Sequence, residues 1–211
     1  MSHPLPTIQG VLLAMTCPVC GRRGSAPCPA CLAELRPAPA LGPPPGVDGC
    51  RALLAYEGVG RELVARLKHR NQRAALPGLA AAAASLVRPD EVDVVTWAPT
   101  TTARRRARGF DQSELLARIV ARRLGRPCRR LLVRAGHVSQ TGRSAVERWR
   151  GPAFAAGRAA HGRVLLVDDV VTTGATVATA ARALRLSGAS RVVVLALART
   201  PIKVPTERDD G

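Results

Sequence analysis

Residues 163–176 read RVLLVDDVVTTGAT, and this stretch decides the fold. It begins with the apolar run 164–167, which is typical of a strand buried on both faces of a parallel sheet. Two carboxylates, Asp168 and Asp169, follow that run, and a threonine-rich loop then leads into an alanine-rich helical pattern from 175 to about 186. The order of strand, acidic pair, loop and helix predicts an α/β domain with a parallel sheet flanked by helices.

The chemistry of this loop suits a phosphorylated sugar. Free backbone N–H groups at a helix start, the helix dipole and threonine hydroxyls can all point at one phosphate. Gly174 allows a close backbone approach, and the two carboxylates can accept hydrogen bonds from vicinal hydroxyls. Each residue alone also fits a plainer interpretation, in which the aspartates end a strand and a threonine caps a helix. The whole string favours a ligand, because adjacent carboxylates after an apolar run are costly unless something uses them.

Composition limits the classes of protein to consider. A chain of 211 residues with 46% hydrophobic residues has room for one α/β domain and a small appendage. The 32 basic and 15 acidic residues give a net charge of +17, which attracts phosphates, including nucleic acid. Aromatic residues make up only 2%, so stacking platforms for single-stranded nucleic acid are largely missing. Apolar runs far shorter than ~18 residues and the lack of a signal-peptide pattern predict a cytoplasmic protein without membrane insertion.

Four cysteines near the start of the chain form two C-x-x-C pairs. Such pairs are suited to tetrahedral zinc, and we expect a structural Zn²⁺ site in which protein ligands fill all four positions. The alternatives are two disulfides, which a reducing compartment disfavours, and a redox pair, which would follow a βαβ pattern. The predicted metal ligands are Cys17, Cys20, Cys28 and Cys31.

The pattern of proline and glycine divides the chain. Residues 36–49, RPAPALGPPPGVDG, have the composition of a semi-rigid linker. We therefore expect a zinc-binding, ribbon-like module at 1–35, a linker at 36–49, an α/β domain at 50–200 and a flexible tail at 201–211.

A second anion-binding site is expected beside the first. The buried-strand pattern at 92–98 runs into a basic loop at 100–108 and then a helix from about 113 to 124, which Asp111 or Ser113 could cap. Ligands of open α/β sheets lie off the carboxyl ends of the strands, so the two sites should be close together. Two anion sites around a ribose indicate phosphoribosyl diphosphate (PRPP), whose pyrophosphate suits the arginine fork. The alternative for the arginine cluster is a solvated surface. The candidate pyrophosphate ligands are Lys68, Arg104, Arg108 and Gly109.

The polar stretch at 137–150 has little periodicity, which is typical both of functional lids and of surface hairpins. Its candidate lid residues are Gln140, Thr141 and Arg148.

Taken together, these motifs resemble the ComF family of phosphoribosyltransferase-like proteins. The resemblance rests on the cysteine pairs, Tyr56 with Lys68, the RGFDQ string at 108–112, the lid residues with Glu147, and the 163–176 string. It implies a type I phosphoribosyltransferase fold, Mg²⁺-dependent PRPP binding and, for the best-known members, a role in DNA uptake during competence. On this resemblance Asp168 and Asp169 are the catalytic pair that holds the ribose hydroxyls. The residues that wrap the 5′-phosphate are Thr172, Thr173, Gly174, Ala175 and Thr176.

Two positions depart from related patterns. Purine-salvage members that act on hypoxanthine or guanine carry a general-base aspartate where this chain has Thr172, which argues against those substrates. Asp111 stands where ComF relatives usually carry asparagine.

The leading hypothesis is therefore transfer of ribose 5-phosphate from PRPP to an unidentified acceptor. The alternative is a non-catalytic accessory factor that keeps the fold as a scaffold or PRPP sensor and associates with single-stranded DNA or DNA-uptake proteins.

Overall fold

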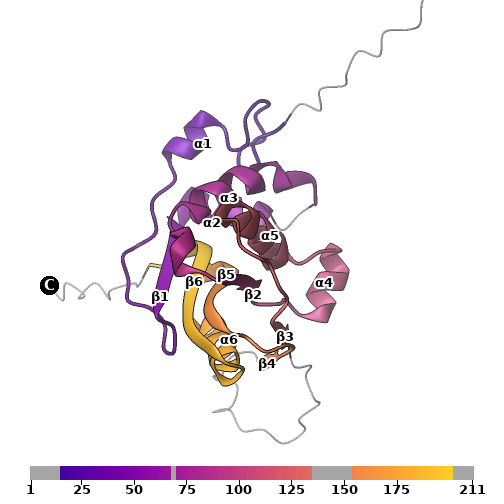
Figure 1. Cartoon of the computed structure of the whole chain (residues 1–211). Coiled ribbons are helices and arrows are strands. Elements are labelled where there is room, and N and C mark those ends of the chain that lie inside the picture. The colour runs from indigo at the N-terminus through magenta and orange to yellow at the C-terminus, as the bar shows by residue number, and fades with distance from the viewer. Residues whose placement is uncertain (1–14, 68–69, 135–153, 202–211) are drawn as a thin grey trace, which may run out of the picture.

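A computed structural model describes residues 15–67, 70–134 and 154–201 (Figure 1). The first half of the described chain contains α1 (Pro29–Ala33), β1 (Gly49–Ala55), α2 (Gly58–Arg66), the 3₁₀ helix η1 (Arg70–Ala75), α3 (Leu76–Ala84), the 3₁₀ helix η2 (Pro89–Glu91) and β2 (Val94–Trp97). The second half contains α4 (Thr102–Arg108), α5 (Gln112–Leu124), β3 (Leu132–Arg134), β4 (Phe154–Ala156), β5 (Gly162–Val171), α6 (Ala175–Leu186) and β6 (Ala189–Arg199).

The main sheet has four strands in the order β1-β6-β5-β2, and every neighbouring pair is parallel. The strand predicted to be buried on both faces, β5, has a neighbour on each side: Leu165 pairs with Val193 of β6 on one side and with Val95 of β2 on the other. Strands β3 and β4 form a separate antiparallel pair. The parallel sheet flanked by helices confirms the predicted fold class.

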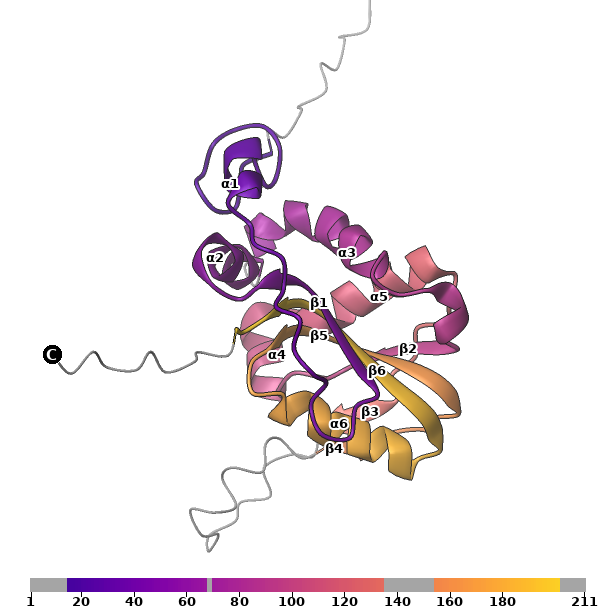
Figure 2. The same ribbon diagram turned by 90° about the vertical axis from the view of Figure 1, so that its left-hand side faces the viewer.

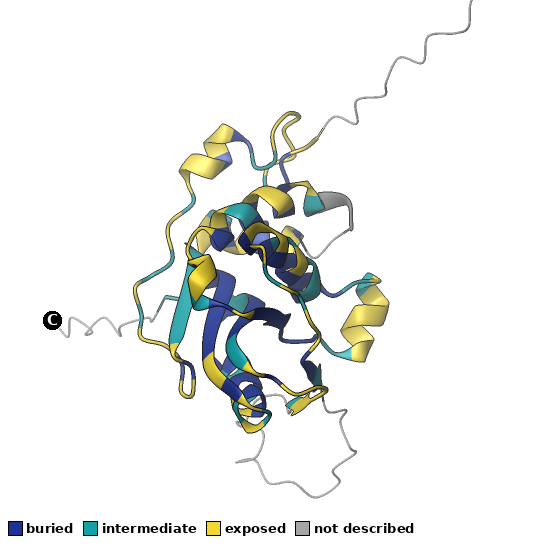
Figure 3. Cartoon of the chain, viewed as in Figure 1, coloured by how far each residue is buried: buried dark blue, intermediate teal, exposed yellow. Residues whose placement is uncertain are grey.

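Helices cover both faces of this sheet (Figure 2). Helices α2, α3 and α5 pack on one face, where their leucines meet Leu165 and Val167 of β5. Helix α6 packs on the other face against Val164 and Leu166. Its buried residues recur at helical spacing, which gives one apolar side to the sheet and one to solvent. The buried residues of α6 are Val177, Ala180, Ala181, Ala183 and Leu184. Figure 3 shows β2 and β6 as mostly buried, whereas β1 is half-buried over most of its length.

Two sequence expectations need correction. The basic segment expected as a loop at 100–108 is helix α4, because Thr101 accepts a hydrogen bond from the Arg104 N–H and Gly109 ends the helix in the left-handed region at φ 76°. Strand β5 does not end at the aspartates but continues to Val171, which pairs with Arg199.

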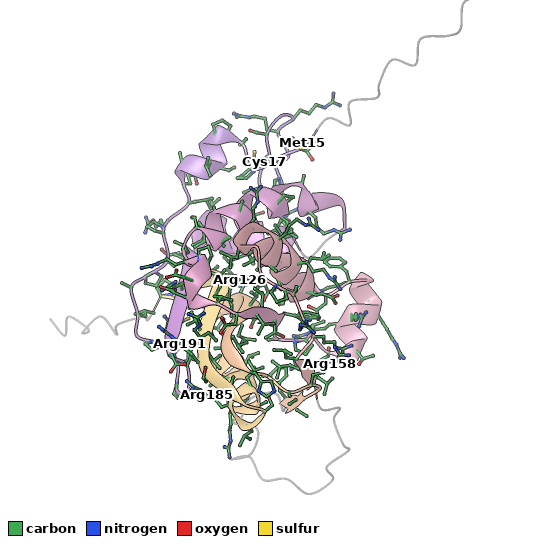
Figure 4. All side chains as sticks on the ribbon, viewed as in Figure 1. Met15, Cys17, Arg126, Arg158, Arg185 and Arg191 are labelled. Atoms are coloured by element: carbon green, nitrogen blue, oxygen red, sulfur yellow. The ribbon has the colours of Figure 1, made fainter. Side chains whose placement is uncertain are left out.

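The cysteine-rich segment lies beyond α2 and α3, at the opposite end of the molecule from α6, as the labelled Cys17 and Arg185 show (Figure 4). Val59 of α2 packs against the cysteines, and Val19 also contacts the main core. Among the helices that the structure describes, none is both long enough and apolar enough to cross a membrane.

Candidate functional site

The loop between β5 and α6 lies where the sheet's central strand leaves its carboxyl end. Thr172 and Thr173 are exposed, whereas Gly174 is buried and begins α6 in the left-handed region at φ 80°. A glycine at this position carries no side chain that could cap α6, and of the N–H groups of the first turn that of Ala175 donates to the Thr173 hydroxyl oxygen (3.4 Å). Such an array of N–H groups at the positive end of a 12-residue helix is suited to an anion.

The two aspartates before this loop differ in their surroundings. Asp168 is only 8% exposed, and its Oδ1 accepts hydrogen bonds from the Ser113 hydroxyl (3.0 Å) and from the Asp169 N–H (2.9 Å). Asp169 is half-buried. Burial, and then the charge of Asp169, raise the pKa of Asp168 to about 8. Asp168 is therefore a buried carboxyl that fixes the backbone at Asp169, and Asp169 is the more accessible member of the pair.

Asp111 connects the second predicted anion site to the first. Its Oδ1 accepts the N–H of Ser113 (3.1 Å) and so caps α5, while its Oδ2 accepts the N–H of Thr100 (2.9 Å) at the exit of β2. Because the next residue but one, Ser113, holds Asp168, a single helix start positions the ends of both β2 and β5. Burial raises the pKa of Asp111 even though three backbone N–H groups oppose that rise.

This arrangement gives a stability prediction for Asp111. We expect Asp111→Ala to lower the free energy of unfolding by about 2 kcal/mol, since both the helix cap and the Thr100 hydrogen bond are lost. Asp111→Asn keeps an oxygen for the cap but has only one acceptor, so it should recover part of that loss. Urea unfolding of the wild type and the two Asp111 variants measures the free energy of unfolding of each. Equal stability of the alanine and asparagine variants would show that the cap contributes nothing.

Arg134 was missed by the sequence analysis. It is the last residue of β3, and its Nη1 donates to the Pro99 carbonyl (3.3 Å) while its guanidinium lies 5.5 Å from the Phe154 ring centre. Burial and the charge of Arg104 lower its pKa, and Asp168 and Asp111 oppose that change. The guanidinium thus lies within the field of both carboxylates. A lone arginine at the end of a three-residue strand has no sequence signal that separates it from the many surface arginines.

The predicted pyrophosphate ligands are only partly described. Arg104 is exposed on α4, Arg108 is half-buried in its last turn, and Gly109 ends that helix. The next residue, Phe110, lies under the guanidinium of Arg73 at 4.3 Å, which connects this turn to the segment before α3. Lys68 lies outside the described residues, as do the predicted lid residues Gln140, Thr141 and Arg148.

Another buried polar group lies next to the Asp111 cap. Both side-chain polar atoms of Gln112 are buried and, within the described part of the chain, have no hydrogen-bond partner. Such groups cost about 1–3 kcal/mol each, and native proteins retain few of them. The signal for Gln112 in the sequence was its place in the RGFDQ string, which did not distinguish its side chain from those of its neighbours.

The four predicted metal ligands come together. The Sγ atoms of Cys17, Cys20, Cys28 and Cys31 all lie within 4.8 Å of one another. Four ligands at the Zn–S distance of about 2.3 Å on a tetrahedron are about 3.8 Å apart, so the cluster has the size of a metal site.

The thiols in this cluster differ in pKa. Backbone N–H groups of Cys20 and Cys28 outweigh burial and lower the pKa of Cys17 to about 6. Burial and the neighbouring sulfurs raise the pKa of Cys31 to about 12. Four thiolates can share this space only with a cation among them.

Comparison with known proteins agrees with this geometry. The model of the phosphoribosyl transferase domain family matches residues 111–210, which include α5, the aspartate pair and the loop before α6. Residues 111–210, just under half of the chain, are therefore similar to a phosphoribosyl transferase domain. The chain is also 30% identical over 144 residues to the competence protein ComFC of Bacillus subtilis (strain 168), an alignment that covers 65% of this chain and 58% of that relative. The resemblance to the ComF family is thereby confirmed, although this chain spans less than two thirds of that relative's length.

Two solved structures are similar to part of this chain. One is the glutamine phosphoribosylpyrophosphate amidotransferase from B. subtilis complexed with ADP and GMP, at 27% identity and a TM-score of 0.41, covering 59% of this chain and 26% of that one. The other is described as the allosteric regulatory enzyme of purine biosynthesis, at 26% identity and a TM-score of 0.42, covering 60% of this chain and 26% of that one.

Proposed function

We propose that the chain binds PRPP with Mg²⁺ and transfers its ribose 5-phosphate to an acceptor, as a pentosyl-transferring glycosyltransferase. The observation that carries the proposal is the β5–loop–α6 unit, in which an aspartate pair near the end of β5 is separated by four residues from Gly174, which begins α6, within the matched domain. The 5′-phosphate would bind the N–H groups and hydroxyls of residues 172–176. Asp169, supported from behind by Asp168, would accept hydrogen bonds from the ribose hydroxyls.

The pyrophosphate would lie toward α4 and Arg134. Arginine at this position offers a planar fork to the phosphate oxygens, and α4 supplies Arg104 and Arg108. Within the described residues the one cluster of three or more candidate metal ligands is the cysteine group, so Mg²⁺ would arrive on the phosphate oxygens of PRPP. When bound there, Mg²⁺ would neutralise charge on the departing pyrophosphate. The protein's part is to position the sugar and to stabilise the positive charge that develops on the ribose.

We propose Zn²⁺ as the occupant of the cysteine cluster, with a structural role. All four cysteines act as ligands in this arrangement, so no position remains for a catalytic water. The pairs belong to a segment too short to fold on a hydrophobic core of its own. Reduced thiols of this kind also support a cytoplasmic location.

Calorimetric titration with PRPP tests the proposal directly. We expect saturable binding with one site per chain in the presence of Mg²⁺, and weaker binding in EDTA because the pyrophosphate charge is then unscreened. Ribose 5-phosphate and pyrophosphate should each compete. A wild-type protein that binds none of these three ligands, while its circular dichroism spectrum shows a folded α/β protein, would contradict the proposal.

A second candidate function rests on the exposed arginines of α4. Arg104, Arg105 and Arg106 are all exposed on a helix at the edge of the fold, and seven-residue α4 contains no acidic residue. Such a face would attract single-stranded DNA through its phosphates and would link the domain to DNA uptake in competence. Anisotropy with labelled single-stranded DNA distinguishes the two functions. Replacing Arg105 and Arg106 by glutamine, with Arg104 kept for the pyrophosphate, should weaken DNA binding strongly and leave PRPP affinity intact if DNA is the partner of α4.

A further inference from the structure

The proline-rich segment that follows the cysteine cluster lies along the phosphoribosyl transferase domain. Pro37 bridges to Leu54, and the Ala38 N–H donates to the Leu53 carbonyl (3.2 Å), so the segment starts beside the carboxyl end of β1. At its other end the Asp48 N–H donates to the Val192 carbonyl (2.9 Å). Figure 2 shows the segment descending beside β1 to α6 and then turning back into β1.

Arg199 holds the middle of this segment. It is the last residue of β6 and only 8% exposed, and its register partner in β5 is Val171, the residue directly before the phosphate loop. Its Nη1 donates to the Leu41 carbonyl (2.9 Å) and its Nη2 to the Gly42 carbonyl (2.6 Å). One buried guanidinium therefore fixes two successive peptide groups next to the loop.

Pro44 then lies directly on the loop. A Cβ placed on Gly174 would lie 2.8 Å from both Cβ and Cγ of Pro44, a separation that Cβ atoms in proteins essentially never show. The buried proline ring thus occupies the space that a side chain at residue 174 would need. Residue 174 has two independent reasons to be glycine, the left-handed φ of 80° and this contact.

We infer that Pro44, held in place by Arg199, is a positioning residue for the phosphate loop, so that the segment between the cysteine cluster and the sheet is part of the 5′-phosphate site. The inference rests on the proposed function. A loop that binds phosphate through backbone N–H groups must hold them in one arrangement, and a loop ordered before binding loses less entropy when the ligand arrives. Pro44 fills the space beside Gly174 that a side chain would occupy in any other residue, and this contact restricts the backbone of residue 174.

The chain offers a matched control for this inference, because Pro43 is exposed next to the buried Pro44. Each proline-to-glycine change raises the conformational entropy of the unfolded chain by a similar amount. A difference in ligand affinity between the two variants therefore reports the contact of Pro44 with Gly174. We expect Pro44→Gly to weaken binding of PRPP and of ribose 5-phosphate about tenfold, which corresponds to about 1.4 kcal/mol. Binding of pyrophosphate, measured by competition, should stay within about twofold, and Pro43→Gly should match the wild type for all three ligands.

Two outcomes would overturn the inference. One is unchanged ribose 5-phosphate affinity in Pro44→Gly, and the other is an equal loss for pyrophosphate, which would indicate general destabilisation. A wild-type protein that binds none of the ligands would instead refute the proposed function. If Pro44→Gly does not fold, Arg199→Lys replaces it: lysine lacks the fork that bonds two carbonyls, and Arg191→Lys, on the same strand but exposed, is its control.

Discussion

Replacing Asp168 and Asp169 together by asparagine is expected to lower the affinity for PRPP by a factor of about 100, because the hydrogen bonds from two ribose hydroxyls to the Asp169 carboxylate are weakened by about 1.5 kcal/mol each. Asparagine keeps the size of each side chain. The Asp168 site keeps an oxygen for the Ser113 hydroxyl and the Asp169 N–H, so the loop is retained while the charge is lost.

Isothermal titration with PRPP and Mg²⁺ measures this change, and Asp90→Asn is the control. Asp90 is exposed in η2, where it pairs with Arg88, at the amino end of β2 and thus at the opposite edge of the sheet. Its variant should bind PRPP as the wild type does. Retention of full affinity by the double variant would mean that the aspartate pair does not contact the ribose.

Asp168 alone should show opposite effects of pH on stability and on binding. Burial raises its folded pKa to about 8, so the stability that it contributes is present at low pH and is lost as pH rises from about 4 through 8. The melting temperature of Asp168→Asn, measured relative to that of the wild type, should therefore rise between pH 5 and pH 9. PRPP affinity of the wild type should rise above about pH 7, where phosphate is already largely ionised because its second pKa is about 6. A parallel rise in the variant would assign that pH dependence to another group.

The sequence predicted those features whose signals are local. The apolar run at 164–167 and the helical spacing of apolar residues after Gly174 are patterns among neighbouring residues. The structure has β5 and α6 where these patterns predicted them. The spacing of the cysteines likewise predicted the cluster of their four Sγ atoms. Asp111 was one of two expected caps, and hydrogen bonds from Ser113 and Glu114 identify it as the cap.

Features that depend on distant contacts could not be predicted. Nothing in the local sequence connects Ser113 with Asp168, which are 55 residues apart, or Pro44 with Gly174. The segment containing Pro44 has the composition of a linker, and only its contacts with Arg199 show that it packs on the domain. Helix α4 was expected as a loop because clustered charge indicated an exposed binding segment, although arginine is also a good helix former.

Removal of the metal should have the largest effect on the N-terminal module. We expect one Zn²⁺ per chain by elemental analysis, and loss of that zinc in a Cys17→Ser/Cys28→Ser variant. Structural zinc sites of four protein ligands supply about 10–16 kcal/mol of apparent binding free energy, far more than a short segment can gain by packing three cysteines and two valines. Residues 15–35 should then become sensitive to protease.

The two remaining cysteines supply the control and a second measurement. Cys50 and Cys128 lie outside the cluster and are half-buried, so their serine variants should keep the zinc. Of the six thiols in the chain, a thiol reagent should reach at most two in the native protein and all six after chelation. Six reactive thiols before chelation would contradict a metal site. Zinc binding without any change in protease sensitivity on its removal would contradict the structural role, because a metal that holds a segment folded must expose it on leaving.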